Sequence, residues 1–204
     1  MKIEINNNNF TLHYSGSVFW HEYKILLVSD VHVGKIANFR EHGLPIPENF
    51  NVLNSVVQKF SPEKIIFLGD LFHGKINKEW SLFADWVVKI GTGVVLVEGG
   101  HDIIDSRTYA NLNVDVCSRL TVADFLLTHH PAESEGFFNF CGHVHPGVKL
   151  KDIGRHPLKL ACFLRTRNQL ILPAFGDISG KHFIKATEYD TVYAIVMNEV
   201  IRVV

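Results

Sequence analysis

The stretch that decides the fold is Lys24 to His32, KILLVSDVH, in which a continuous apolar run ends in polar residues. A run rich in Ile, Leu and Val is typical of a strand that is buried on both faces of a sheet. Asp30 and His32 follow directly after this strand, and open α/β sheets bind their ligands at the carboxyl ends of their strands. The stretch therefore predicts an α/β fold with a ligand site at the strand ends.

The same pattern repeats along the first half of the chain. Apolar runs predict strands at 64–68 and 94–97, and helical spacing predicts helices over 47–59, 78–90 and 103–111. Further strands are predicted within 1–20, near Asp115, and at 124–128, 137–141, 147–150, 158–164, 169–172, 192–197 and 200–203. This order favours an α/β fold with an antiparallel later portion, built as two packed sheets flanked by helices in one domain spanning 1–204.

Composition excludes several classes of protein. Hydrophobic residues make up 47% of the 204 residues and the formal net charge is -1, so neither disorder nor a global attraction for polyanions is expected. The N-terminus has no apolar signal region and no apolar run is long enough to cross a membrane. The three cysteines, Cys117, Cys141 and Cys162, form no Cys-x-x-Cys pair, which argues against a disulfide framework or thiolate zinc site and fits a cytoplasmic protein.

Twelve histidines are the unusual feature of the composition, and many of them follow predicted strands together with carboxylates. These strand-end motifs are Asp30-Val-His32, Gly69-Asp70, Gly99-Gly100-His101-Asp102, His129-His130 and Gly142-His143-Val-His145. Oxygen and imidazole ligands without thiolate suit Mn, Fe, Zn or Mg. Two carboxylates and several imidazoles exceed the needs of one ion, as in two-metal hydrolases. Asp-x-His or Gly-Asp alone arises readily by chance or in a turn, but the ordered set at strand ends is a strong signal.

This ordered series resembles the calcineurin-like metallophosphoesterases. Four longer segments are similar to the ligase-associated DNA-damage-response metallophosphoesterases of bacteria: Asp30–Pro47, Gly69–Gly74, Cys141–Leu150 and Leu172–Gly180. The resemblance implies a four-layer α/β/β/α sandwich that hydrolyses a phosphodiester with a metal-bound hydroxide. It further implies a nuclease linked to DNA repair, with nucleic acid as substrate and an association with DNA-repair ligase or helicase machinery.

The resemblance also implies a role for each motif residue. Two divalent ions are expected, with manganese favoured over Fe, Zn or Mg. The first ion would be held by Asp30, His32, Asp70 and His145. The second would share Asp70 and add His129 and His143. His101 would be the general acid, with Asp102 orienting its ring. The family's spacing selects His129 over His130 as the ligand, and His130 is expected to be structural or to support the ligands.

One position departs from the family pattern. The family has Asn before the catalytic His, where it ligates the second metal and touches the phosphate, whereas this chain has Gly100. Glycine has no side-chain oxygen, so a weaker or incomplete second site is expected. The alternatives are a lineage that tolerates the loss, a substitution introduced on purpose, and a degenerate site.

Substrate contacts are less well marked. Lys35 and His73 follow metal motifs and are candidates for binding phosphate, or else ordinary loop residues. Eight basic residues between Lys149 and Lys185, interleaved with Phe163, Phe175 and Phe183, would form a nucleic-acid track if some of them share a face near the metals. Three functions follow: a nuclease, a phosphoesterase acting on a nucleotide or other small metabolite, and a metal-binding module impaired by Gly100.

Overall fold

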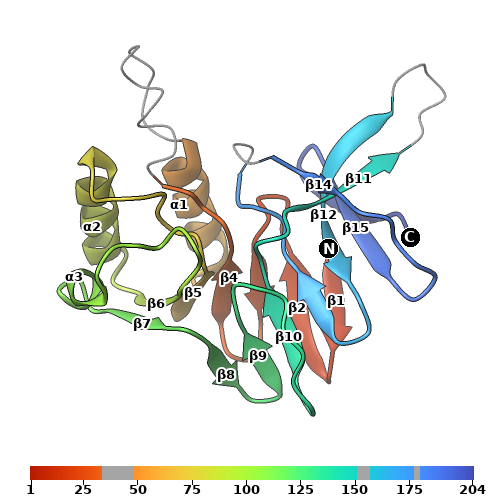
Figure 1. The fold of residues 1–204 in the computed structure, drawn as a ribbon, viewed down its shortest axis with the longest axis horizontal. Coiled ribbons are helices and arrows are strands. Elements are labelled where there is room, and N and C mark those ends of the chain that lie inside the picture. The colour runs from red at the N-terminus through yellow and green to blue at the C-terminus, as the bar shows by residue number, and fades with distance from the viewer. Residues whose placement is uncertain (34–47, 151–156, 177–179) are drawn as a thin grey trace.

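The computed structural model describes residues 1–33, 48–150, 157–176 and 180–204. Two β-sheets pack face to face, and the helices cover the outer face of the first sheet (Figure 1). Apolar side chains on both faces of the first sheet explain this layering, because each face buries its own core. The expected α/β class with two packed sheets is confirmed.

The first sheet has seven strands in sequence order, β1 (Lys2–Ile5), β2 (Asn8–Leu12), β3 (Val18–Trp20), β4 (Ile25–Val28), β5 (Lys64–Leu68), β6 (Gly93–Val97) and β7 (Val114–Cys117). Strands β1 to β4 pair antiparallel, and β4 to β7 pair parallel. The predicted central strand is β4, and its four residues are buried. Parallel pairing brings the carboxyl ends of β4, β5 and β6 to one edge of the sheet.

Three helices connect or follow the parallel strands: α1 (Glu48–Phe60), α2 (Lys78–Ile90) and α3 (Ser106–Ala110). Helix α2 begins where the Asn77 side chain accepts a hydrogen bond from the Glu79 amide, and it ends at Gly91 in the left-handed conformation. Its apolar stripe, Phe83, Trp86 and Val87, packs in the core between the helices and the first sheet. This helical layer supports the strands that carry the polar ends.

The second sheet has nine strands: β8 (Leu120–Val122), β9 (Phe125–Leu127), β10 (Phe138–Cys141), β11 (Pro146–Leu150), β12 (Leu158–Arg165), β13 (Gln169–Ile171), β14 (His182–Phe183), β15 (Thr191–Val196) and β16 (Glu199–Arg202). The prediction of an antiparallel later portion is corrected here, because β10 pairs parallel with both β9 and β13. Parallel pairing places the residues after β9 and β10 at the same edge, so His129 and His143 lie close to each other.

The second core lies between the two sheets. Alternate residues of β4 show how the strand serves both cores, since Leu26 and Val28 face the helices whereas Ile25 and Leu27 face the second sheet. Of the four layers that the resemblance implies, the described residues form three, because all their helices pack on the first sheet. No helix within the described ranges is long and apolar enough to cross a membrane.

Candidate metal centre

The loops after β4 and β5 are joined by backbone hydrogen bonds. The Asp30 amide donates to the Gly69 carbonyl at 3.1 Å, and the His32 amide donates to the Asp70 carbonyl at 2.9 Å. A short parallel bridge between Val33 and Phe72 extends the pairing beyond the strands. These backbone hydrogen bonds fix Asp30 and Asp70 relative to each other without any side-chain contact.

Five of the six predicted metal ligands have a left-handed backbone. The φ angles of Asp30, His32, Asp70, His143 and His145 are 55°, 50°, 50°, 65° and 49°. This region is uncommon for residues with a side chain, and such residues cluster at functional sites. The left-handed backbone at these residues directs their side chains toward one region, where the potential ligand atoms lie close together.

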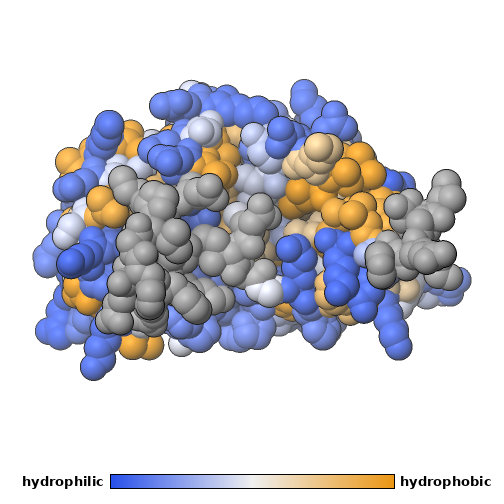
Figure 2. Space-filling model, turned by 90° about the horizontal axis from the view of Figure 1, so that it is seen from above, coloured by the Kyte–Doolittle hydropathy of each residue, from blue (hydrophilic) through white to orange (hydrophobic). Residues whose placement is uncertain are grey.

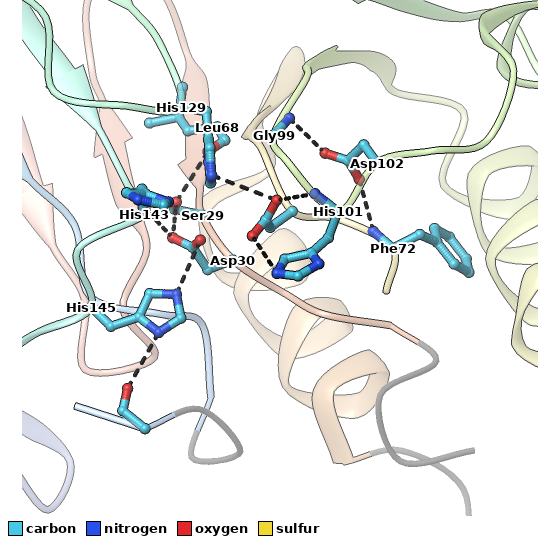
Figure 3. A network of polar contacts seen from close by, with 12 residues as sticks. Ser29, Asp30, Leu68, Phe72, Gly99, His101, Asp102, His129, His143 and His145 are labelled. Atoms are coloured by element: carbon cyan, nitrogen blue, oxygen red, sulfur yellow. Dashed lines mark hydrogen bonds and ion pairs between the residues drawn. The ribbon is translucent and has the colours of Figure 1, made fainter. Parts of the chain in front are cut away.

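Asp30 is fully buried and is held from several sides (Figure 3). Its Oδ2 accepts hydrogen bonds from the Ser29 hydroxyl and from the His143 amide at 3.0 Å, and its Oδ1 lies 3.1 Å from Nε2 of His145. Burial by itself raises the pKa of this carboxyl, but the contacts with His145 and Ser29 outweigh it and lower the pKa below its usual value. Asp30 is therefore held as a carboxylate, the form that binds a cation.

His129 lies beside Asp70 with its ring almost completely buried. Its Nδ1 is 2.9 Å from the carbonyl oxygen of Leu68, and because a carbonyl can only accept, Nδ1 is the protonated nitrogen. Nε2 is thus left with its lone pair, lies 3.5 Å from Oδ1 of Asp70, and has no hydrogen-bond partner. A histidine that donates one N–H to a carbonyl and presents the other nitrogen is the usual arrangement of a metal ligand.

Three glycines make room for ligand side chains. A Cβ at Gly99 would collide with the carboxylate and amide of Asp70, and one at Gly142 would collide with Ser29 and Asp30. A Cβ at Gly69 would collide with the His129 ring. These glycines let the side chains of Asp70, Asp30 and His129 pack against the neighbouring loops.

Gly100 differs from these glycines. A Cβ added at Gly100 would have no atom of the described residues within 4 Å, and the φ angle of Gly100 is not positive. A side chain at this position therefore fits without strain. The position that departs from the family pattern is open space next to His101.

His101 and Asp102 occupy different environments. The His101 amide donates to Oδ1 of Asp70 at 2.9 Å, and its ring, 53% exposed, has Nε2 at 3.9 Å from Oδ2 of Asp70. Both oxygens of Asp102 accept from the backbone, from the Phe72 amide at 3.0 Å and the Gly99 amide at 2.9 Å. Asp102 thus ties the loop after β6 to the loop after β5, rather than hydrogen-bonding the His101 ring as expected. Burial raises its pKa.

The remaining imidazoles surround the two aspartates. The His145 ring lies between Asp30 and Gly180, and its Nδ1 is 3.3 Å from the Gly180 carbonyl oxygen. The centroids of the His32 and His145 rings are 5.4 Å apart. The exposed His143 ring lies 5.0 Å from His129 and 4.0 Å from His130. Burial, followed by the two neighbouring imidazoles, lowers the pKa of His143.

The structure brings together all six predicted metal ligands, and the potential ligand atoms fall into three overlapping groups. These groups are Asp30, His32 and His145; Asp30, Asp70 and His129; and His129, His130 and His143. The His73 ring lies beside the site, tilted against the His101 ring with 4.6 Å between the ring centroids, whereas Lys35 lies outside the described residues. His130 is exposed and His129 is buried, so the geometry favours His129 as the inner ligand.

The donor set fits a pair of divalent cations. Nε2 of His129 is buried and points toward the site without a hydrogen-bond partner, which is costly for a buried polar group in the absence of a ligand. Asp70 groups with Asp30 and His129, and the family resemblance makes it the candidate bridging carboxylate. Oxygen and imidazole ligands of this kind suit Mn, Fe or Zn.

Sequence reasoning missed two contributors to the site. Ser29 was interpreted only as the polar end of a strand, yet its hydroxyl donates to Asp30. The Leu68 carbonyl sets the protonation of His129, and no side-chain pattern reports a backbone group. The Ser-Asp pair after an apolar run was the one available signal for Ser29.

The family model of the calcineurin-like phosphoesterases matches residues 23–160. The crystal structure of Pseudomonas putida nuclease MPE is similar, with a TM-score of 0.86 and 27% identity over 100% of this chain and 99% of that chain. The phosphoesterase Yfce from E. coli has a TM-score of 0.45 and 15% identity over 88% of this chain and 97% of that chain. No curated protein matches the sequence.

Proposed function

Because the chain belongs to the calcineurin-like phosphoesterases, we propose that it is a nuclease that hydrolyses phosphodiester bonds in nucleic acid with the help of two divalent ions. The observation that carries this proposal is the convergence of two buried aspartates and four histidines at the strand ends. The similarity to a Pseudomonas nuclease over the whole chain supports the substrate class. A role in DNA repair and manganese as the native metal belong to the same proposal.

The residues divide into holding and proton-transferring groups. Asp30, His32 and His145 would hold one ion, His129 and His143 the other, and Asp70 would contact both. When bound, such ions lower the pKa of water to about 7 and neutralise charge on the phosphate. Asp30 and His32 follow β4 of the first sheet, and His145 precedes β11 of the second sheet. The packing of the two sheets therefore fixes the separation of these three residues.

His101 is the group that would protonate the leaving oxygen. Its ring is half-exposed and lies at the mouth of the site, next to Asp70 and His73. The ring is positioned through its own backbone, because the His101 amide is bound to Asp70 and the flanking Asp102 is bound to two backbone amides. A proton donor held this way stays within reach of substrate without being buried.

The test is hydrolysis of a labelled oligonucleotide and of a chromogenic phosphodiester with Mn(II), Mg(II), Zn(II) and Fe(II) in turn. Wild-type protein is expected to cleave both substrates, and Asp70→Ala neither, because it loses the candidate bridging carboxylate. His101→Asn is the matched variant that leaves the ligands intact, and we expect it to bind metal normally but to turn over slowly. Cleavage of the chromogenic diester without the oligonucleotide would favour a small-metabolite phosphoesterase instead.

Failure of both reactions in a folded, metal-loaded protein would point to Gly100. The family pattern has Asn at this position, and a Cβ at Gly100 meets no described atom within 4 Å, so an Asn side chain has room there. In that case Gly100→Asn should restore turnover. If it does not, a metal-binding module without catalysis becomes the better assignment.

A further inference from the structure

A basic surface lies on the arm that leaves the metal centre. Strands β11, β12 and β14 lie side by side, and the arm extends from the second sheet (Figure 1). Lys149 pairs with Lys159, Gly147 pairs with Ala161, and Gly147 also pairs with Phe183. Paired residues and alternate residues of a strand share one face, so these side chains lie on the same side of the arm.

The two lysines are held close together over one aromatic ring. Nζ of Lys149 lies 4.7 Å from the centroid of Phe183, and Nζ of Lys159 lies 5.8 Å from it. Like charges directly opposite each other destabilise a strand pair, and the ring offsets only part of that repulsion. Within the described residues neither lysine forms an ion pair with a carboxylate. The arrangement therefore favours an external anion.

This face continues into the metal centre. Ala161 and Lys181 line a small pocket together with His145. Gly147 lets Lys181 and Phe183 pack directly against strand β11, since a Cβ there would lie 2.9 Å from Cβ of Lys181 and 3.4 Å from Cδ1 of Phe183. The His182 amide also donates to the His145 carbonyl at 2.9 Å, so the ligand and the arm are one connected unit.

We propose that Lys149, Lys159 and Lys181, supported by Phe183, bind the phosphate backbone of the nucleic-acid substrate on one side of the bond that is cleaved. The proposal rests on the proposed function. A strand rises about 3.3 Å per residue, so Lys149 lies roughly 13 Å along the chain from His145, which is a span of a few nucleotides. Viewed from above, the molecule shows hydrophilic residues interspersed with hydrophobic patches (Figure 2).

The other aromatic residues of this part of the chain do not contribute. Phe163 and Phe175 were candidates for stacking on bases, but both are buried in the cores, at 0% and 1% exposure. Phe183 is half-buried and its ring lies under the two lysines. The surface therefore recognises phosphates rather than bases, and its affinity should not depend on sequence.

The experiment compares wild type with the double variant Lys149→Gln/Lys159→Gln and with a control that removes two exposed lysines elsewhere, Lys64→Gln/Lys89→Gln. Binding of a fluorescent single-stranded oligonucleotide is measured in EDTA at several salt concentrations. Loss of two phosphate contacts should weaken binding several-fold and reduce the slope of log K against log salt by about 1.4. The control variant should bind like wild type. Hydrolysis of the chromogenic diester, which is too small to reach the arm, should be unchanged in both.

The outcomes separate this inference from the proposed function. If the arm variant keeps wild-type affinity and salt slope while wild type cleaves DNA, the surface is not a binding site although the nuclease assignment stands. If binding depends on the two lysines but wild type does not cleave the oligonucleotide, the inference holds and the nuclease assignment fails. Absence of any oligonucleotide binding by wild type would overturn the inference.

Discussion

The carbonyl oxygen of Leu68, at the end of β5, accepts a hydrogen bond from Nδ1 of His129 at 2.9 Å. The bond leaves Nε2 of His129 unprotonated, buried, and 3.5 Å from Asp70. A backbone group of the first sheet thereby orients a candidate metal ligand from the second sheet. The relationship also distinguishes His129 from its neighbour His130, which is exposed.

Replacing these two histidines should have unequal effects. His129→Ala is expected to lower the number of bound ions and to reduce turnover at least 10-fold, because the buried ligand is lost. His130→Ala should retain both ions and most of the activity. Metal content by mass spectrometry after dialysis, with steady-state rates on a chromogenic diester, checks both variants. Equal metal loss in the two would show that the hydrogen bond to Leu68 does not select the ligand.

The neighbouring glycines Gly99 and Gly100 should respond in opposite ways. Gly100→Asn is expected to leave stability within about 0.5 kcal/mol and to raise affinity for the second ion, because its side chain meets open space. Gly99→Ala should cost roughly 1–3 kcal/mol and lower metal content, because its Cβ collides with Asp70. Thermal unfolding and metal titration of both variants test the pair. A stable, fully loaded Gly99→Ala protein would contradict the packing seen here.

Asp102 should matter for stability and His101 for turnover. In Asp102→Asn the single side-chain oxygen can accept from only one of the two backbone N–H groups, those of Phe72 and Gly99. The other backbone N–H then faces the side-chain NH₂ group, which cannot accept a hydrogen bond. The expected loss is about 1–3 kcal/mol in urea unfolding. His101→Asn, at a half-exposed position, should change stability by less than about 0.5 kcal/mol. If Asp102→Asn unfolds like wild type while its pH–rate profile shifts, Asp102 acts on the imidazole after all.

His13 should make the fold sensitive to acid. It is 5% exposed, and its Nε2 accepts a hydrogen bond from Nζ of Lys59 at 3.2 Å. Burial, followed by the charges of Lys59 and the N-terminus, lowers its pKa to about 4. Between pH values of about 4 and about 6.5, His13 binds a proton in the unfolded chain but not in the folded chain. The free energy of unfolding should therefore fall as the pH drops from about 6.5 to about 4.

The size of this effect is expected to be roughly 1–3 kcal/mol, since each unit of pKa difference corresponds to about 1.4 kcal/mol and solvent screens the charge of the exposed Lys59. Urea unfolding in EDTA between pH 4.5 and 7.5 measures it. His13→Gln should show a flatter dependence on pH than wild type, whereas the exposed His182→Gln should follow wild type. Parallel curves for wild type and His13→Gln would rule out His13 as the source.

Much of the architecture could be predicted from the sequence because it depends on local pattern. The apolar run at 25–28 and the spacing within 78–90 predict a strand and a helix that the structure contains with nearly the same bounds. The pairing of the later strands could not be predicted in this way. Parallel and antiparallel partners have similar side-chain patterns, and the partners of β10 are chosen by the core between the sheets.

The sequence by itself determined which chemical groups are available and where along the strands they fall. Residue identity and spacing place Asp30, His32, Asp70, His129, His143 and His145 at strand ends in order, and the family resemblance implies that they are metal ligands. Only the tertiary structure decided what these groups do together. The tautomer of His129, the backbone contacts of Asp102, the space at Gly100 and the pairing of Lys149 with Lys159 all depend on segments far apart in sequence. Those contacts arise from packing two sheets against each other, and no local pattern records such packing.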